Sequence, residues 1–307
     1  MPDNVAAEES PKEDSMQELL LQYTFYHGIR QTRSEKEDAY LFIDQSYQEM
    51  GYPIEYGKLS AGITKYGYCV AGDLDAAKEV FIAPFDTRNK TYFRWYTTYP
   101  FDEKRNSVQN GVAAVVDTVL CVALAVGVYA LLAWLLPWRW LAVLGGVVVL
   151  AVYMLLRRNP FNFSTGAPLA LMHYIAGHRA KKKRYAFVFL DKSTDNYIPL
   201  KLFLVKYKRE LRGANHVWYL SNLAHGQKLA MGAHAEDEGA AEAARALGAE
   251  LVCEGLPRCF DEADNLVLLT SVENDGAGRP CAKDTRSKRD KKMDVPRLKA
   301  LAEAFIG

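Results

Sequence analysis

Hydrophobic and polar residues alternate along most of the chain at helix or strand spacing, but two stretches near its middle are almost purely apolar. The first, residues 118–136, holds no charged residue, and the second covers residues 140–156. At about 1.5 Å per residue, each is close to the length that a helix needs to cross a bilayer. Only residues 137–139 separate the two runs, so we expect an antiparallel hairpin of membrane-spanning helices. A buried hairpin in a soluble core is the alternative, although uncharged stretches of this length are rare there.

The residues that flank the two runs predict the orientation of this hairpin. Basic residues lie on its outer flanks (Lys104, Arg105, Arg157 and Arg158), whereas the turn holds only Arg139. Cytoplasmic flanks carry the excess of Lys and Arg in membrane proteins. Because a hairpin returns the chain to the side it left, we expect an integral, two-pass membrane protein with its soluble domain and both termini in the cytoplasm. Residues 112–156 would contact the lipid bilayer, and Asp117, near the interface, is expected to cap or snorkel.

Outside the hairpin, helix-like and strand-like patterns follow one another in alternation. Helices are expected within residues 16–50, 167–179, 236–250 and 295–306, and strands at 66–74, 79–86, 184–191, 201–207, 216–223 and 265–272. This order predicts an α/β fold of three αβα layers around a mostly parallel mixed sheet. Ser34 and Glu37 have the spacing of a capping box at the start of a helix, and Gly51 is expected to end the same helix. Residues 274–294 are expected to form a loop.

The chain therefore divides into a split domain interrupted by the hairpin. We expect a disordered acidic tail at 1–15, the first part of the domain at 16–109, the hairpin at 110–158 and the second part at 159–307. The tail lacks the basic-then-apolar order of a signal peptide.

Composition narrows the functional classes. Half of the residues are hydrophobic, which is too many for a disordered chain, and a net charge of +1 gives no support for nucleic-acid binding. The five cysteines are scattered without a Cys-x-x-Cys pair, so neither a disulfide framework nor a structural zinc site is indicated.

Six short motifs occur in a characteristic order, each at the expected end of a helix or strand. They are Arg33-Ser34 through Gly51-Tyr52, Ile82–Thr87, Phe161–Gly166, Asp191–Thr194, Tyr219–Asn222 and Pro280–Thr285. In order and context they resemble the landmarks of the co-catalytic zinc exopeptidases, the family of bacterial leucyl aminopeptidase and glutaminyl cyclase. The resemblance covers nearly all of the chain outside the tail and the hairpin, and it implies a zinc-exopeptidase-like domain.

The resemblance also implies a metal site whose ligands this chain lacks. In that family His, a bridging Asp, Glu, Asp and His hold two zinc ions, and a second Glu is the general base. The corresponding positions here are Pro84, Asn162, Ser193, Thr194, Ser221 and Pro280, and only Asp86, which orients a ligand in the family, is kept. Because proline has no donor atom and neutral oxygens bind zinc weakly, we expect no metal, no cofactor and no catalytic residue.

These observations favour a membrane-anchored, catalytically inactive relative of the aminopeptidases, acting as a binding, scaffold or regulatory subunit. Its residual cleft could hold a peptide end or a small ligand. The alternative is an active membrane-bound hydrolase with a relocated site. A third possibility is that the hairpin pairs with another membrane protein or a second copy through Gly127, Ala130, Gly145 and Gly146.

Other candidate chemistry is weaker. Asp86 and Asp191 could pair across a cleft as acid and base, but buried, hydrogen-bonded carboxylates are favoured. Cys253 and Cys259 are expected to be core residues, and the six histidines to be packing or surface residues. The basic runs 178–184 and 279–299 could contact anionic headgroups, although solvated loops explain them equally well.

Overall fold

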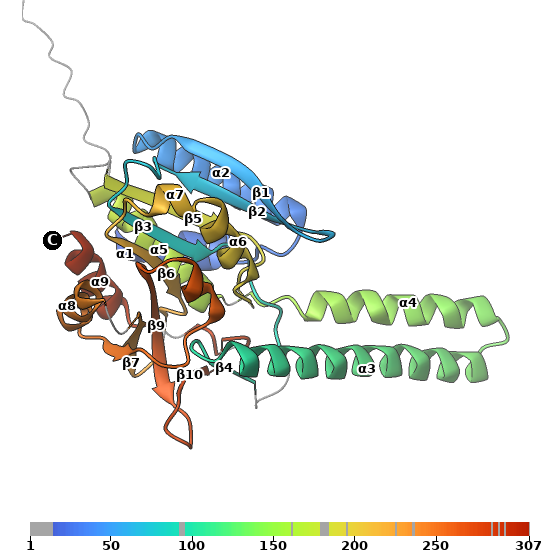
Figure 1. The fold of residues 1–307 in the computed structure, drawn as a ribbon. Helices are drawn as coiled ribbons and strands as arrows, with labels where there is room; N and C mark the ends of the chain where they lie inside the picture. The colour runs from blue at the N-terminus through green and yellow to red at the C-terminus, as the bar shows by residue number, and fades with distance from the viewer. Residues whose placement is uncertain are drawn as a thin grey trace, which may run out of the picture.

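The structure is a computed structural model that describes residues 15–306, except 92–95, 161, 179–183, 195, 225, 235–236, 284, 288 and 292. The predicted tail lies outside the described residues apart from Ser15, which caps the first helix. The described residues form a central ten-stranded mixed sheet with helices on both faces, from which a long helical hairpin projects (Figure 1).

Four parallel strands form the middle of the sheet, and antiparallel strands flank them. The order is β1-β2-β5-β3-β6-β9-β10-β4, with β7 beside β9 and β8 beside β7. The strands are β1 (Ile54–Ala61), β2 (Thr64–Ala71), β3 (Glu79–Pro84), β4 (Thr97–Thr98), β5 (Tyr185–Leu190), β6 (His216–Ser221), β7 (Lys228–Gly232), β8 (Glu250–Val252), β9 (Leu266–Asn274) and β10 (Pro280–Lys283). Strands β5, β3, β6 and β9 run parallel, so their carboxyl ends meet at one edge.

The helices bury the two faces of this sheet. They are α1 (Met16–Leu21), the π-helix η1 (Gln22–Tyr26), α2 (Arg33–Glu49), α3 (Glu103–Leu135), α4 (Arg139–Leu156), α5 (Phe163–His178), α6 (Ile198–Lys206), α7 (Lys208–Leu211), α8 (Glu238–Leu247), the 3-10 helix η3 (Arg258–Glu262) and α9 (Val295–Ile306). One core cluster joins α1, α2, α5, α8 and α9 to the sheet, and a second joins α6, α7 and η3 to its other face. All six residues of β5 are buried, as expected for a strand covered on both sides. The predicted three-layer fold is confirmed.

One predicted strand is wrong: residues 201–207 lie in and just after helix α6. Pro199 occupies the first turn, where its fixed φ and missing N–H suit a helix. Leu200, Phe203 and Leu204 are buried while Val205 is half exposed, which is helical rather than strand spacing. The apolar run was too short to separate the two by pattern alone.

Three smaller predictions also need correction. Helix α2 is capped by Thr32 with Glu35, so the capping box lies two residues before the predicted Ser34 and Glu37. The predicted loop at 274–294 contains strand β10. Strands β1, β7 and β8 were not predicted, because their half-exposed or short sequences carry a weak apolar signal.

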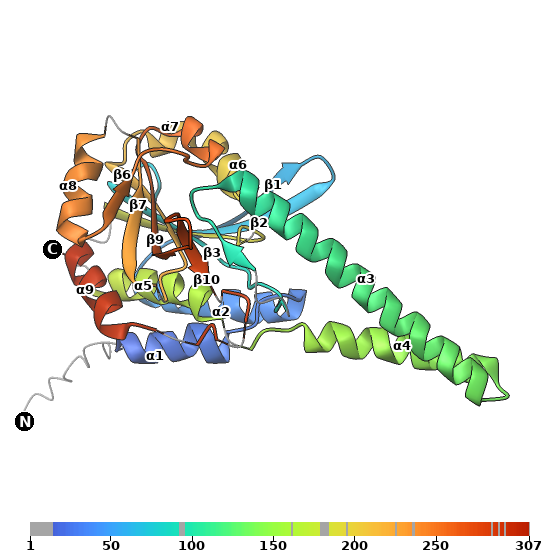
Figure 2. The same ribbon diagram turned by 90° about the horizontal axis from the view of Figure 1, so that it is seen from below.

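The hairpin consists of α3 and α4, which pack along each other and extend away from the sheet (Figures 1 and 2). Both helices are long and apolar enough to cross a membrane, and very few of their apolar side chains are buried. At the base of α4, Arg157 Nη2 lies 2.8 Å from Asp117 Oδ2 on α3. Helix α3 begins at Glu103, fifteen residues before the apolar run at 118–136.

Candidate functional site

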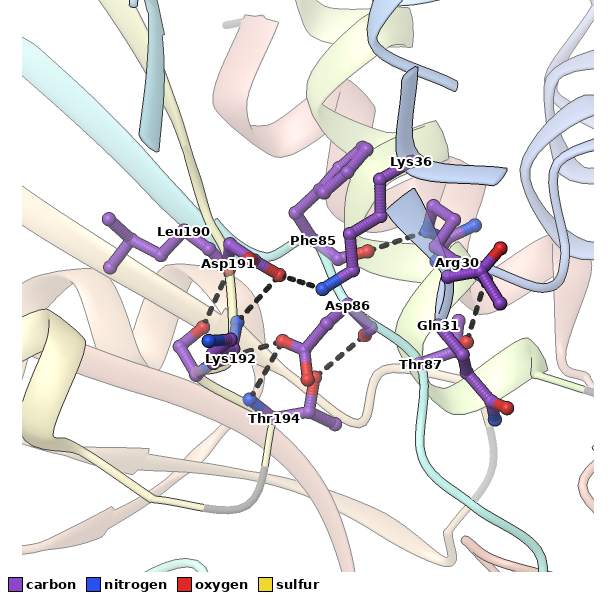
Figure 3. A network of polar contacts seen from close by, with 12 residues as sticks. Arg30, Gln31, Lys36, Phe85, Asp86, Thr87, Leu190, Asp191, Lys192 and Thr194 are labelled. Carbon is purple, nitrogen blue, oxygen red and sulfur yellow. Dashed lines mark hydrogen bonds and ion pairs between the residues drawn. The ribbon is translucent and has the colours of Figure 1, made fainter. Parts of the chain in front are cut away.

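The carboxyl ends of β5, β3 and β6 are where an open α/β sheet usually places its ligand site. Strand β3 ends at Pro84 and continues as Phe85-Asp86-Thr87-Arg88, and β5 ends at Leu190 before a tight turn. Lys192 in that turn has a φ of 57°, which bends the chain back toward β3. The two loops therefore lie against each other (Figure 3).

Asp86 holds the loop after β5 in place. Its Oδ1 accepts hydrogen bonds from the backbone N–H groups of Ser193, at 2.9 Å, and Thr194, at 3.3 Å. The Thr194 hydroxyl donates in return to the Asp86 carbonyl oxygen, at 2.7 Å (Figure 3). The Asp86 carboxylate thus holds the loop after β5 in place, as the buried, hydrogen-bonded alternative predicts.

Arg88 occupies the centre of the site. Its side chain is buried, and Nε and Nη2 donate to the Thr194 carbonyl oxygen at 3.2 and 2.5 Å. Nη1 donates to Asn222 Oδ1 at 3.3 Å and, weakly, to Thr98 Oγ1 at 3.5 Å. One guanidinium group therefore links the segments after β3, β5 and β6 to β4. These bonds compensate the cost of burying its charge.

Around Arg88 lies a cavity of about 20 Å³, which has room for about one water molecule. Polar and aromatic side chains dominate its lining, and Arg88 supplies the charge. The lining residues are Arg88, Tyr96, Thr98, Pro100, Asn106, Asn110, Ser193, Thr194, Asn196, Tyr197, Tyr219, Ser221 and Asn222. We call this cavity and its lining the strand-end pocket.

The first turns of α3 form one wall of the strand-end pocket. Asn106 accepts a hydrogen bond from Tyr99 N–H at 2.7 Å and donates to the Tyr99 carbonyl oxygen at 2.6 Å. Asn110 Oδ1 accepts from the Tyr96 hydroxyl at 2.5 Å and from Arg286 Nη2 at 3.0 Å. The helix that enters the hairpin is therefore fixed to the pocket by its side chains.

Two further cations lie behind the same loops. Lys36 Nζ of α2 contacts Asp191 Oδ1 at 2.5 Å, with both side chains largely buried. Arg30 is fully buried, and its Nε donates to the Phe85 carbonyl oxygen at 2.5 Å (Figure 3). Burial lowers the pKa of Arg30 to about 10, although the charge of Asp86 opposes this, so Arg30 stays protonated at neutral pH.

The structure brings together only some of the residues that the sequence singles out. Ser193, Thr194 and Ser221 line the strand-end pocket, and Asp86 braces the loop that carries the first two. Pro84 is the last residue of β3, where it is paired with Leu190 and buried.

Two predicted positions lie outside the pocket lining. Asn162 precedes α5, and its Nδ2 donates to the carbonyl oxygens of Gly28 and Asn159, at 2.6 and 2.5 Å. Pro280 lies on β10 opposite Asn274, in the β9–β10 hairpin. Phe161 and Asp284, which belong to the recognised motifs, lie outside the described residues. That the seven positions descend from a metal site stays a prediction.

Sequence reasoning missed the residue that dominates the pocket. Arg88 follows Asp86 by two positions. The sequence does not distinguish a polar residue that is buried after a strand from one that is exposed to solvent. Asn222 follows the Ser221 position and has a φ of 50°, a conformation in which asparagine is enriched. Asn106 and Asn110 lie on α3, far along the chain from β5 and β6, so nothing in the sequence pattern connects them to the strand ends.

The strand-end pocket does not fit zinc. Its oxygen donors are neutral amides, hydroxyls and carbonyls, and its charged group is a buried cation that would repel a metal ion. Within the described ranges, no three His, Cys, Asp or Glu side chains are placed to hold a metal ion.

The described histidines and cysteines have structural surroundings. His173 is buried beside Tyr23, His178 stacks on Tyr174, and His216 pairs with Glu79. Cys259 is buried in the second core cluster, and burial raises its pKa to about 12, which suits an unreactive thiol. Cys253 is only partly buried, so the prediction that it is a core residue is wrong.

In the basic run 279–299, several cations form ion pairs with carboxylates of the same domain. Arg279 contacts Asp275 at 2.8 Å, and Lys283 contacts Glu273 at 3.3 Å. Residues 179–183 of the first run lie outside the described part of the chain. Contact of either run with headgroups stays a prediction.

The sequence comparisons find no match, whereas the comparison of structures finds proteins with the same fold. No protein-family description and no curated protein matches the sequence. Among solved structures, glutaminyl cyclase from Porphyromonas gingivalis superimposes with a TM-score of 0.58 at 10% identity, over 96% of this chain and 97% of that one. This chain has a zinc-exopeptidase and glutaminyl-cyclase-like fold.

Two other neighbours agree with this assignment. A Zn-dependent exopeptidase from Parabacteroides distasonis matches with a TM-score of 0.52 at 12% identity, covering 96% of each chain. The LapA aminopeptidase of Legionella pneumophila matches with a TM-score of 0.51 at 9% identity, over 96% of this chain and 70% of that one. The family resemblance read from the motifs is therefore confirmed for the fold of this peptidase-like domain.

Proposed function

We propose that this protein is a membrane-anchored, catalytically inactive member of the peptidase-like fold that acts as a binding, scaffold or regulatory subunit. The observation that carries the proposal is the position of Arg88. A buried guanidinium group is bonded to the loops after β5 and β6, at the strand ends where this fold would need anionic ligands for a metal.

Three features of the site support a loss of catalysis. Neutral oxygens and a cation replace the donor set that a dinuclear zinc centre requires. The cavity of about 20 Å³ is small beside the hundreds of Å³ of a usual small-molecule site. The Asp86 carboxylate, the retained motif acid, already accepts two backbone hydrogen bonds and braces a loop.

The hairpin supports the anchoring role. Helices α3 and α4 expose apolar side chains along their length, which lipid would cover. The basic residues at the base of the hairpin favour a cytoplasmic domain by the positive-inside rule. Because α3 forms a wall of the strand-end pocket, the domain and its anchor behave as one connected unit.

Metal analysis and an activity screen of the full chain, purified in nanodiscs, test the proposal. We expect no stoichiometric zinc after dialysis, no heat of zinc binding in calorimetry, and no turnover of aminoacyl or N-terminal glutaminyl substrates. Two tightly bound zinc ions per chain, or turnover that a chelator abolishes, would overturn it. Turnover that resists chelation and is lost in Asp86→Ala would instead establish a hydrolase with a relocated site.

A further inference from the structure

Two exposed apolar features lie on the side of the domain from which the hairpin projects, and neither belongs to the hairpin. The first is the turn between β1 and β2. Ala61 pairs with Thr64, so the turn has two residues, Gly62 and Ile63. Gly62 has a φ of 58°, as the first position of a type II′ turn requires.

Ile63 at this turn is fully solvent-exposed, with a relative accessibility of 102%. Turn positions are normally filled by Gly, Asn, Asp or Ser, because they are solvated and need unusual backbone angles. A β-branched apolar residue at the outermost point of a hairpin gains nothing from the fold of its own chain. Its side chain is therefore free to contact a surface outside the domain.

The second feature is an apolar patch at the end of α1 and in η1, made by Leu21, Phe25 and Tyr26. These side chains are 54%, 72% and 71% exposed, and the rings of Phe25 and Tyr26 meet edge to face. Residues i, i+4 and i+5 lie on one side of a helix. We call this group the η1 patch.

Contacts place the η1 patch close to the base of α4. Gly28, two residues after Tyr26, accepts a hydrogen bond from Asn162, whose side chain also bonds to the Asn159 carbonyl oxygen. Arg158, directly after α4, is 3.0 Å from Glu35 in the first turn of α2. The segment that carries the aromatic pair is thus fixed to the chain where it leaves the hairpin.

The views of the whole chain agree with these contacts. The β1–β2 turn points in the same direction as the α3–α4 hairpin in both Figures 1 and 2. Helix α1 runs along the body toward the base of α4 in Figure 2. The β1–β2 turn thus extends in the direction of the hairpin, and the helical segment that carries the η1 patch ends near the base of α4.

The positive charge around the β1–β2 turn is complementary to an anionic phospholipid surface. Residues 56–72 contain no acid, and Lys58 and Lys65 lie on the two strands. Lys192 adds a third cation, because its Nζ donates to the Lys65 carbonyl oxygen at 3.2 Å. Cations next to the surface of an anionic leaflet are attracted to it, and exposed aromatic rings favour the headgroup level.

We propose that Ile63 and the η1 patch are peripheral membrane contacts, which insert into the interface of the same leaflet that α3 and α4 enter. This inference rests on the membrane anchoring proposed above. The occupant is the phospholipid interface, and the domain would lie against it in one orientation, supported at two points beside the hairpin.

Depth-dependent fluorescence quenching in nanodiscs tests the proposal. In a Cys121→Ser, Cys253→Ser background, whose remaining cysteines are buried, Phe25→Cys and Ile63→Cys each receive an environment-sensitive label. The discs contain phosphatidylcholine and phosphatidylglycerol with a nitroxide near the headgroup. We expect blue-shifted emission and roughly twofold or stronger quenching at both sites, since interfacial side chains meet that lipid region.

Two control positions separate the possible failures. Glu303→Cys on α9, at the end of the body away from the hairpin, should stay unquenched (Figures 1 and 2). Leu131→Cys, exposed on α3, should be quenched by a nitroxide deep in the acyl chains. Quenching at 131 with none at 25 and 63 would overturn this inference and leave the anchoring intact. No quenching at 131 would overturn the anchoring itself.

A protein occupant would give a different result. Emission at 25 and 63 that shifts to the blue without lipid quenching, and only in discs with two copies, would assign these contacts to self-association. That outcome also overturns the lipid proposal.

Discussion

The side chain of Arg88 decides how the strand ends are held together. A guanidinium group offers several donors in a fixed plane, so one side chain can bond to two loops and to strand β4 at once. An ammonium group cannot reproduce that geometry, and an apolar side chain leaves the Thr194 carbonyl and Asn222 without their bonds.

We therefore predict that Arg88→Met lowers the free energy of unfolding by about 2–4 kcal/mol, because buried acceptors lose a charged partner. Arg88→Lys should recover only part of this loss. Chemical denaturation of the full chain in detergent measures the change. Arg33→Met is the control, since that side chain is 92% exposed and its removal should have no measurable effect. Equal stability of the Arg88 and Arg33 variants would contradict the assigned role.

His173 gives a prediction about pH. Burial lowers the pKa of His173 to about 4, and its Nδ1 lies 2.9 Å from the Tyr23 hydroxyl. Between pH 6.5 and 4 the unfolded chain binds a proton that the folded chain does not, so stability falls as the pH falls. Relative to His173→Gln, the wild-type chain should lose about 2 kcal/mol between pH 7 and pH 5.

Denaturation midpoints of both proteins at the two pH values check this expectation. A pH dependence that is the same in both would show that His173 is not the group responsible. His216 provides an internal contrast, because its hydrogen bond to Glu79 raises its pKa and makes its own contribution larger at low pH.

Residue-level chemistry was only partly predictable from the sequence. The family resemblance pointed to the motif positions Ser193, Thr194 and Ser221, and all three line the strand-end pocket, whereas a former metal role for them stays a prediction. Arg88, Tyr96 and Asn222 were not found, because residue type alone does not tell a buried polar side chain from a solvated one.

At the scale of elements, the strongest signals were the long or continuous apolar ones. Strand β5 and the two hairpin helices were predicted correctly as elements, since β5 is a short, aromatic-rich apolar run and the hairpin runs are too long for a strand. The prediction for helix α6 failed because residues 201–207, five of them apolar and one β-branched, suit both periods, and the deciding Pro199 lies just outside the run.

Gly146 lies where α3 and α4 are in contact. A Cβ there would lie 3.5 Å from the Ala125 carbonyl oxygen and 3.9 Å from Tyr129 Cβ, so an alanine would fit, whereas the atoms of leucine beyond Cβ would press on α3. By contrast, a Cβ at Gly127 would meet nothing within 4 Å.

We predict that Gly146→Leu destabilises the hairpin by about 1–3 kcal/mol, as overpacking does in well-packed interiors, whereas Gly127→Leu is tolerated. Cysteine crosslinking between α3 and α4, followed by heating in detergent, compares the two variants. If Gly127→Leu were the more disruptive change, the exposed side of α3 would be a protein contact rather than a lipid-facing surface.

At the scale of the whole molecule, the topology of the hairpin makes a prediction about accessibility. Tags added before residue 1 and after residue 307 should react with an impermeant reagent only after the cytoplasmic side is opened. A cysteine at Arg139, in the turn, should react from the opposite side in intact cells. Labelling of all three positions from one side would show that α3 and α4 do not cross the membrane.

The whole fold was easier to predict than the function, for a physical reason. A sheet with two covered faces is specified by many apolar positions at once, so errors at single elements leave the architecture intact. A site depends on a few side chains and on their orientation, and at about 10% identity to its structural neighbours the chain shares the frame without showing the chemistry.

Helix α3 runs without a break for 33 residues, about 50 Å, from the wall of the strand-end pocket to the far turn of the hairpin. Under the proposed anchoring, the first turns of α3 lie in the domain and the rest of the helix lies in the bilayer. A change in bilayer thickness that tilts the apolar part would then also displace Asn106 and Asn110 at the other end. We therefore expect the shape of the strand-end pocket to depend on the thickness of the membrane.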